Sequence, residues 1–534
     1  MTRIERYSAS LPFMLLVLIL MLSLFGCKGE PIMVDEPIPF SRLLENQKMS
    51  SQIFKVDINY AVLLPEDYNE SIDDYPVVYL LHGFGDNEKA WYTSGSIKYY
   101  SDLYNDQIVP MIYVMPIGYN TYYVNRYTGS YPYMDMITTE LVPTIDSLFR
   151  TKQDKTARAV MGYSMGGYGA LILPALNPDI FTVGVPLSMS FRTDEQYISE
   201  PQGVFDYQWG TIFGGKGASG EARLTDYFKQ HSPFHFFSSS NRDEFAGLKF
   251  LIDCGDDEET LTITNDALHA LMRDNQIPHE YRVRSGGHSF DYWKKSYPEA
   301  LKFISNSVQG IPHPSNPEPV TIGERITSSD FESVEISGVE INILKPVDYT
   351  TSTVDYPVVY VIHDYEEGQR ESNVTEIFSL LRNGMTAGTL KNSVVVEVPV
   401  SESIESDRIA EIISYVDTQY RALTDRASRV ILGNALGGLH AANLAAENSS
   451  LFGSCFLFDA QLQEEGVNPQ TDIFYYLDIS DDGDSYRGYH HFYVKIRETD
   501  IGYEYRVRQG AESFQSFLNG LSESFPSLRN SLKN

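Results

Sequence analysis

One short stretch of the chain, from Ala157 to Pro178, limits the possible fold more than any other. An apolar, β-prone run ending at Met161 leads into Gly162-Tyr163-Ser164-Met165-Gly166, and a helix-like segment follows as far as Asn177-Pro178. This G-x-S-x-G pattern predicts a nucleophile elbow, a tight turn between strand and helix that exposes a strained serine side chain. Its glycines allow the two elements to approach without Cβ clashes. The stretch therefore predicts an α/β fold with Ser164 as a candidate nucleophile.

The first residues predict a leader that is removed from the mature chain. Arg3 and Arg6 precede an apolar run from Leu11 to Phe25 that is too short to span a bilayer comfortably. Leu24-Phe25-Gly26-Cys27 resembles the lipobox of bacterial lipoproteins, in which Cys27 becomes the lipidated first residue. The alternative is an ordinary secretory signal with an incidental cysteine.

We accordingly expect residues 1–27 to be a lipoprotein signal peptide and residues 28–50 to be a polar tether. The expected location is the bacterial cell envelope, with the chain lipid-anchored at the outer membrane on its periplasmic or surface-exposed side. Contact with the membrane is expected through the lipid alone.

The net charge of −31 at pH 7 argues against a nucleic-acid partner, because phosphate would be repelled. The acidic residues are spread along the chain, which is typical of a solvated acidic surface. Beyond Cys27 the chain contains only Cys254 and Cys455, both in apolar, strand-like contexts. We interpret them as small buried residues rather than a disulfide or a metal site, and we expect neither a metal nor a cofactor.

The rest of the chain repeats one plan twice, alternating strand-like runs with amphipathic segments. A proline-rich stretch from Gly310 to Pro319 separates the two copies and predicts a stiff linker. Three sequence blocks return in the same order. They are Tyr75–His82 as Tyr356–His363, Arg158–Gly167 as Arg429–Gly438, and Glu280–Phe290 as Glu504–Phe514. The chain is therefore predicted to be a tandem duplication, each half a mostly parallel sheet flanked by helices.

The two copies diverge at the positions where chemistry is expected. The first-half residues Ser164, His288 and Gly83 correspond to Ala435, Glu512 and Asp364 in the second half. A carboxylate cannot replace an imidazole that accepts a proton and returns it to the leaving group. The stretch between the serine and histidine positions is also much shorter in the second half. The second half is therefore expected to be catalytically inactive.

A nucleophilic serine needs a general base, an acid that orients the base, and donors for the oxyanion. In doubly wound hydrolases the order along the chain is serine, acid, histidine. His288 follows the strand-like run Tyr281 to Arg284 and is the candidate base. The acid is expected in the acidic loop after Phe250. Composition does not choose among its candidates, which are Asp253, Asp256, Asp257, Glu258 and Glu259.

Four ordered motifs resemble the putative-esterase family. They are His82-Gly83, Gly162–Gly167, Asp253-Cys254-Gly255 and Gly286–Trp293. The family includes the esterase D group, the feruloyl and acetyl-xylan esterases of carbohydrate esterase family one, and the mycolyltransferases. The resemblance covers roughly residues 50–308, and residues 320–534 match only as a degenerate copy. It implies a catalytic α/β-hydrolase-type domain at 51–308, a linker at 309–320 and a non-catalytic domain of the same type at 321–534.

The resemblance also implies roles for individual residues. In related feruloyl esterases the triad acid is an aspartate three residues beyond the strand-end glycine, which corresponds here to Glu258. Mycolyltransferases use a glutamate, and Asp257 remains the alternative acid. In the second half Gly483 occupies the acid position. By elbow geometry the N–H of Met165 is one oxyanion donor, and the N–H of Phe84 is expected to be the other.

Tyrosines crowd the loop-like stretch from Tyr113 to Tyr133 and suggest a stacking platform for sugars or an aromatic acyl group. A well-packed tyrosine-rich loop is an equal alternative. The candidate substrate-binding residues are Tyr122, Tyr123 and Tyr127, together with Trp91 and Tyr163.

The resemblance and the lipid tether imply a cell-envelope serine esterase with a Ser164–His288–Glu258 triad. The expected substrate is a feruloyl or acetyl ester on plant polysaccharide. Two alternatives use the same triad: an acyltransferase, and an esterase for a small ester such as a siderophore. A third alternative is a surface glycan-binding lipoprotein. For the second half, binding or structural support is the leading hypothesis.

Overall fold

The computed structural model describes residues 41–258, 260–400 and 406–533. The predicted signal peptide, Cys27, the first part of the tether and Glu259 lie outside the described residues. None of the helices in the described part of the chain has the length and apolar character needed to cross a membrane.

The first half is built on eight strands in the order β1-β2-β4-β3-β5-β6-β7-β8. The pairs β1–β2 and β2–β4 are antiparallel, and the remaining neighbours run parallel. The strands are β1 (Leu43–Ser50), β2 (Asp57–Leu63), β3 (Val77–Leu81), β4 (Ile112–Pro116), β5 (Arg158–Tyr163), β6 (Val183–Leu187), β7 (Lys249–Gly255) and β8 (Glu280–Arg284).

The second half repeats this order in its own strands, as β9-β10-β12-β11-β13-β14-β15-β16. The antiparallel pairs are again the first two, β9–β10 and β10–β12. These strands are β9 (Glu332–Ile336), β10 (Val339–Leu344), β11 (Val358–His363), β12 (Val394–Pro399), β13 (Arg429–Asn434), β14 (Ser454–Phe458), β15 (Phe474–Ser480) and β16 (Tyr503–Arg508). The shared order and pairing agree with the predicted duplication and the predicted α/β fold class.

The two halves meet at their last strands, since β8 and β16 pair antiparallel through Val283 and Val507. One sixteen-stranded sheet results, and Leu43–Asn534 cluster as one compact unit. The tandem copies therefore share a continuous sheet.

Both faces of the sheet are buried, as the apolar character of the central strands requires. In β3, Val77, Tyr79 and Leu81 enter one apolar cluster, while Val78 and Leu80 enter the cluster on the opposite face. The helices that cover the first half are α2 (Ile97–Leu103), α3 (Tyr133–Met136), α4 (Val142–Leu148), α5 (Met165–Leu176), α12 (Thr260–Asp274) and α13 (Phe290–Val308). Those of the second half are α14 (Arg370–Thr386), α15 (Ser406–Gln419), α16 (Ala435–Glu447), α17 (Tyr486–Arg497), α18 (Phe514–Glu523) and α19 (Phe525–Ser531).

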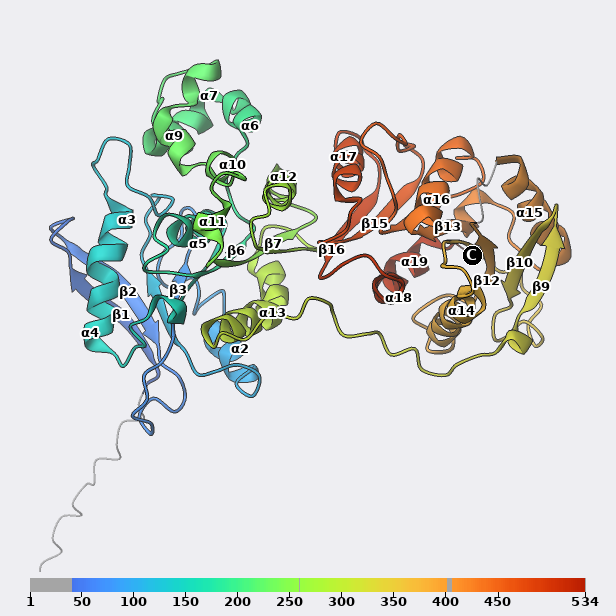
Figure 1. Cartoon of the computed structure of the whole chain (residues 1–534), viewed down its shortest axis with the longest axis horizontal. Coiled ribbons are helices and arrows are strands. Elements are labelled where there is room, and N and C mark those ends of the chain that lie inside the picture. Colours follow the sequence, from blue (N-terminus) through green and yellow to red (C-terminus); the bar gives the residue numbers. More distant parts are fainter. Residues whose placement is uncertain (1–40, 259, 401–405, 534) are drawn as a thin grey trace, which may run out of the picture. The chain divides into compact units, whose positions relative to one another are not determined.

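A helical insertion between β6 and β7 distinguishes the first half from the second. It contains α6 (Asp194–Ser199), α7 (Gln202–Val204), the π-helical turn η3 (Phe205–Trp209), α8 (Gly210–Phe213), α9 (Asp226–His231), α10 (Pro233–Phe236) and α11 (Arg242–Phe245). Most of these short helices gather in one cluster (Figure 1). Only residues 459–473, which contain no helix, join β14 to β15. This accounts for the shorter serine-to-histidine spacing of the second copy.

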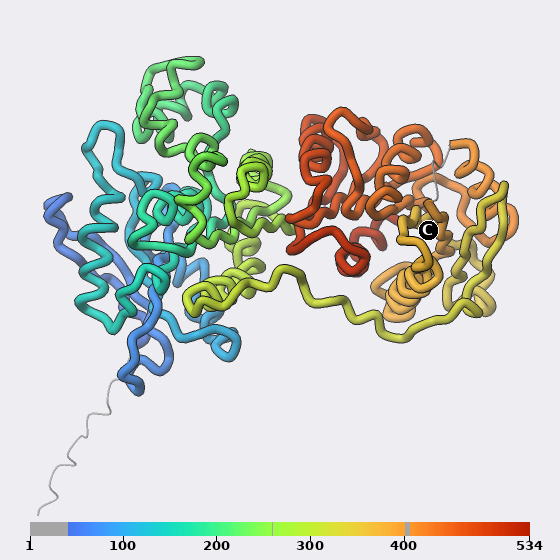
Figure 2. The backbone as a smooth tube through the Cα atoms, in the orientation of Figure 1, coloured from blue at the N-terminus to red at the C-terminus, as the bar shows by residue number. Residues whose placement is uncertain are grey.

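Some predicted boundaries are corrected by the structure. The tether was expected to reach residue 50, but Leu43–Ser50 form β1 because they pair with β2. Tyr113 lies in β4 rather than in a loop. After α13 the chain continues without helix or strand until the 3-10 turn η5 (Ser328–Asp330) (Figure 2). From Val320 onward it already packs against the second half, because the Val320 N–H donates to Asn519 and Ile322 joins the apolar cluster there. Cys254 and Cys455 are free and buried, as predicted.

Candidate active site

Ser164 occupies a sharp turn between β5 and α5. Its backbone has φ 59° and ψ −120°, a strained conformation for a residue other than glycine. A Cβ atom on Gly162 would lie 2.1 Å from the carbonyl oxygen of Gly166, so glycine is required where the strand and the helix cross. The geometry is that of a nucleophile elbow.

Aromatic packing holds the residue before the serine. The ring of Tyr163 stacks on Trp293 with centroids 4.3 Å apart, and its hydroxyl donates a hydrogen bond of 2.7 Å to Asp86. Tyr163 is only 2% exposed, and burial raises its pKa. The predicted role of Tyr163 in contacting substrate is therefore replaced by a role in fixing the elbow.

His288 and Glu258 form the second part of the site. The Nδ1–H of His288 donates to Glu258 Oε2 at 2.8 Å. The imidazole side chain is 40% exposed, whereas the Glu258 side chain is fully buried. Asp257, the alternative acid, is exposed and points to no such partner among the described hydrogen bonds. With Nδ1 occupied, Nε2 is the ring nitrogen free to accept a proton.

Two further donors hold the Glu258 carboxylate, and one of them was missed in the sequence. The backbone N–H of Gly255 donates to Oε1 at 3.0 Å, and the buried hydroxyl of Ser188 donates to the same oxygen. Ser188 in turn accepts a 2.7 Å hydrogen bond from the indole N–H of Trp293. A signal was available, since Ser188 directly follows the apolar strand β6 in the way that Ser164 follows β5.

Trp293 connects the elbow to the base. One aromatic contact is its stack on Tyr163, and another is an edge-on contact with His288 at 5.1 Å between ring centroids. The Trp293 indole thus contacts Tyr163 and His288 directly, and it contacts Glu258 through Ser188. Trp293 therefore links the elbow that carries Ser164 to the His288–Glu258 pair.

The loop after β3 adjoins the serine. A Cβ atom on Gly83 would lie 3.3 Å from the Cβ of Ser164, so Phe84 immediately follows a residue packed against the nucleophile. The buried His82 shapes this loop, because its Nδ1–H donates to the Gly83 carbonyl at 2.8 Å and its Nε2 accepts from the Gly118 N–H at 2.7 Å. Burial lowers the pKa of His82, which favours this neutral tautomer.

The two predicted oxyanion donors belong to segments that adjoin Ser164. Met165 is the first residue of α5, where backbone N–H groups have no partner within the helix. Phe84 is half-buried, and its ring contacts Tyr207, an exposed residue of η3, with centroids 5.7 Å apart.

The predicted aromatic platform is not formed by Trp91, Tyr122 or Tyr123, because all three side chains are fully buried. Tyr123 donates to the carbonyl of His82 at 2.9 Å, and Tyr122 contacts the hydroxyl of Ser190 at 3.2 Å. These rings pack beneath the site. Among the predicted platform residues, Tyr127 is exposed, and its ring packs against Tyr227 of α9.

The second half keeps the elbow but not its chemistry. Ala435 retains a positive φ of 47° at the start of α16. The carboxylate of Asp364 accepts a 3.2 Å hydrogen bond from the N–H of Leu436, the counterpart of the Met165 N–H. Glu512, at the histidine position, accepts from the N–H of Ser485. An oxyanion would find the Leu436 donor already occupied by a negative charge.

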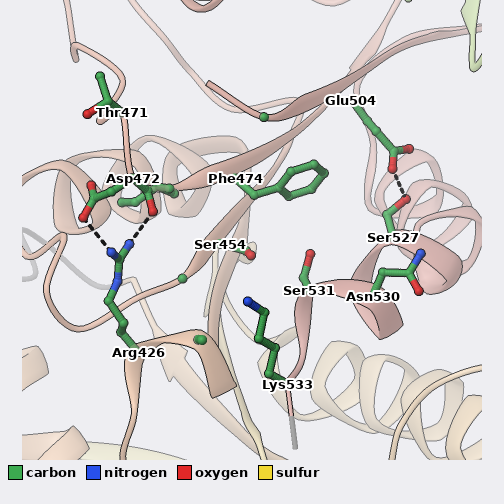
Figure 3. A pocket seen from close by; sticks show the side chains of 14 residues that line it. Arg426, Ser454, Thr471, Asp472, Phe474, Glu504, Ser527, Asn530, Ser531 and Lys533 are labelled. Atoms are coloured by element: carbon green, nitrogen blue, oxygen red, sulfur yellow. Dashed lines mark hydrogen bonds and ion pairs between the residues drawn. The ribbon is translucent and has the colours of Figure 1, made fainter. Parts of the chain in front are cut away.

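A cavity of about 620 Å³ lies elsewhere in the second half (Figure 3). Its walls come from the amino-terminal ends of β14, β15 and β16 and from the last helix. Among its charged side chains, Arg426 pairs with Asp472 at 2.6 Å and Glu504 accepts from Ser527 at 2.6 Å, and Lys533 also lines the cavity. Ala435 and Asp364 follow the carboxyl ends of their strands, so this cavity is no part of the elbow site.

Comparison with known proteins gives three relevant similarities. A bacterial "Endo-1,4-beta-xylanase/feruloyl esterase" from Xylanibacter ruminicola is 33% identical over 27% of this chain and 21% of that protein. An "Acetyl esterase" from Caldicellulosiruptor saccharolyticus is 23% identical over 48% of this chain and 95% of that protein. A solved ferulic acid esterase has 23% identity and a TM-score of 0.42, covering 50% of this chain and 98% of that one.

The match to the xylanase/feruloyl esterase covers only 21% of that protein's length. The match to a family model is more extensive and coincides with the half that carries the elbow, the acid and the base. Residues 51–304 of this chain match the model of the family described as "Putative esterase".

Proposed function

We propose that the chain is a serine esterase that hydrolyses carboxylic esters with Ser164, His288 and Glu258. The observation that carries this proposal is the 2.8 Å hydrogen bond from His288 to the buried Glu258, at the site where Ser164 stands on a strained elbow. A serine is activated when a base takes its proton and an acid holds the base in the correct tautomer.

In the proposed reaction Ser164 Oγ attacks the ester carbonyl while Nε2 of His288 accepts its proton. Glu258 orients the imidazole and stabilises the imidazolium that forms. The N–H groups of Met165 and Phe84 stabilise the oxyanion of the tetrahedral intermediate. His288 then protonates the leaving alcohol, and a water molecule activated by the same nitrogen releases the acyl group from Ser164.

We propose feruloyl or acetyl groups on plant polysaccharide as the substrates. Support comes from the similarity of this chain to a xylanase/feruloyl esterase and to an acetyl esterase. The exposed Tyr207 and the half-buried Phe84 beside the elbow offer aromatic surface to an acyl or sugar group. The cell-envelope location is also a proposal, and it depends on Cys27.

The test uses protein lacking residues 1–27, with and without Ser164→Ala, on p-nitrophenyl acetate and methyl ferulate. We expect hydrolysis that disappears in the variant, and the ratio of the two rates ranks acetyl against feruloyl esters. Transfer of the acyl group to an added sugar in place of water would favour the acyltransferase. No reaction of any ester in folded protein would contradict the proposal.

For the second half we propose a non-catalytic, supporting role. The observation that favours it is the Asp364 carboxylate on the Leu436 N–H, which occupies the counterpart of the Met165 donor with a negative charge. Restoring Ala435→Ser and Glu512→His in the Ser164→Ala background should give no esterase activity, because Asp364 still blocks the site and Gly483 supplies no acid. Recovery of activity would refute this role.

A further inference from the structure

The seam between β8 and β16 contains two copies of one hydrogen-bonded arrangement. In the first copy Arg506 of the second half donates through Nη1 to Asp256 Oδ2 at 2.5 Å. In the second copy Arg282 of the first half donates through Nη1 to Asp481 Oδ2, also at 2.5 Å. The two carboxylates hold equivalent places in the duplicated sequence, as do the two arginines.

The equivalence extends to the backbone around each carboxylate. Asp256 Oδ2 also accepts from the Tyr505 N–H at 3.3 Å, and Asp481 Oδ2 accepts from the Tyr281 N–H at 3.2 Å. The other oxygen of each carboxylate accepts from a glycine N–H in the next loop, at 3.0 Å from Gly286 and at 2.7 Å from Gly510. Each aspartate therefore joins its own two loops to the opposite half.

The consequence differs between the halves because only one pair of loops carries a triad. Asp256 lies two residues before Glu258, and Gly286 lies two residues before His288. The N–H of Asp257 also donates to the Gly286 carbonyl at 3.0 Å. The loop that carries Glu258 and the loop that carries His288 are therefore hydrogen-bonded to each other beside Asp256. The corresponding loops of the second half end in Gly483 and Glu512, which perform no catalysis in the proposed function.

The Asp256 clamp is buried and strongly charged. The side chains of Arg506 and Asp256 are 15% and 3% exposed. Burial raises the pKa of Asp256, and the guanidinium of Arg506 opposes that rise. A buried carboxylate without its cationic partner would be an uncompensated charge, so the loops around it would rearrange.

A second group of contacts anchors the helix that follows the acid loop. Asp266 of α12 accepts from the hydroxyl of Tyr505 at 2.8 Å and also pairs with Tyr486 and His490 of α17. The hydroxyl of Tyr503 donates to the carbonyl of Asp256 at 3.2 Å. The second half thus holds both ends of the segment that contains Glu258.

We propose that the second half is a built-in positioning element for the catalytic centre, in which Arg506 clamps Asp256 and thereby sets the relative position of Glu258 and His288. This inference rests on the proposed triad and adds a role for residues more than 200 positions away from it. Arg506 and Asp256 are positioning residues, since they act on the reacting groups through the loops.

The duplicated seam supplies a matched control. Asp256→Asn and Asp481→Asn remove the same charge from equivalent bridges, but only the first bridge supports the triad loops. Arg506→Met removes the partner of Asp256 in the second half, and so tests whether the effect on activity depends on that half. The readouts are kcat and KM on p-nitrophenyl acetate, the rate at which a fluorophosphonate labels Ser164, and the thermal unfolding midpoint.

We expect Asp256→Asn and Arg506→Met to lower kcat and the labelling rate by about 10- to 100-fold with KM changed little, since small displacements of catalytic groups have effects of this size. Asp481→Asn should lower the unfolding midpoint comparably and leave both rates within about twofold of the parent. The double variant Asp256→Asn/Arg506→Met should be no slower than the slower single variant, because both changes break one bridge.

Equal loss of activity in Asp256→Asn and Asp481→Asn would overturn the inference, because the bridges would then be merely structural. Full activity in Asp256→Asn would overturn it as well. If Arg506→Met does not fold, the comparison of the two asparagine variants still decides. Absence of hydrolysis and labelling in the folded parent would instead contradict the proposed function.

Discussion

Glu258→Gln tests the acid of the triad with little change in shape. The carboxylate lies 2.8 Å from His288 Nδ1, and an ion pair at that separation is worth about 6 kcal/mol at an effective dielectric constant of about 20. If this energy were lost entirely in the transition state, the rate would decrease by roughly 25,000-fold. The imidazole is 40% exposed, and solvent screens part of the interaction, so we expect kcat to fall by between about 1,000- and 10,000-fold.

The assay is the steady-state hydrolysis of p-nitrophenyl acetate, with KM measured separately because the carboxylate is not expected to contact substrate. Asp257→Asn is the matched control, since Asp257 is the adjacent carboxylate and is exposed. We expect its kcat to stay within about twofold of the parent value, as is usual for surface substitutions. A decrease of less than tenfold in Glu258→Gln, or an equal loss in Asp257→Asn, would refute the assignment of the acid.

Three other predictions concern separate parts of the chain. Gly83→Ala would place a Cβ atom 2.7 Å from the ring of Tyr163, which is tightly packed. Because that ring cannot move aside, kcat/KM should fall at least about tenfold in a folded protein. Unchanged kinetics would contradict this prediction. Burial raises the pKa of Asp459 to about 7, so the folded chain keeps a proton on this group that the unfolded chain releases near pH 4. The contribution of Asp459 to the free energy of unfolding is therefore lost as the pH rises from 4 to 7. In Asp459→Asn, the free energy of unfolding measured in urea should therefore fall less between pH 4 and pH 7 than in the parent. An equal fall in both proteins would show that Asp459 does not have this raised pKa. Cys27→Ser should move the chain from the membrane fraction to the soluble fraction and abolish palmitate labelling, whereas persistent labelling would exclude Cys27 as the lipidated residue.

The sequence predicted the elements whose signal is local. The strand, the elbow and the helix around Ser164 could be identified from glycine spacing and apolar runs, because each depends on neighbouring residues. The duplication could be identified from repeated blocks, and the divergent second copy distinguished Ser164 and His288 from other serines and histidines. The resemblance to related esterases chose Glu258, which is the acid that the structure places on His288.

Other parts of the site depend on contacts between distant segments, for which no local pattern exists. Ser188 lies 70 residues from the carboxylate that it holds, and Arg506 lies 250 residues from Asp256. The predicted stacking platform was wrong for Tyr122 and Tyr123 for a related reason. Tyr122 and Tyr123 are amphipathic, so the sequence allowed either a surface or a core position, and tertiary packing placed them in the core.

We infer that the chain holds one serine nucleophile, in its first half, and none in its second. The most direct measurement is the mass-spectrometric mapping of fluorophosphonate adducts on the folded chain and on its Ser164→Ala variant. We expect one adduct per chain, located on Ser164, and none in the variant. An adduct at any residue of the second half, or labelling that survives Ser164→Ala, would contradict it.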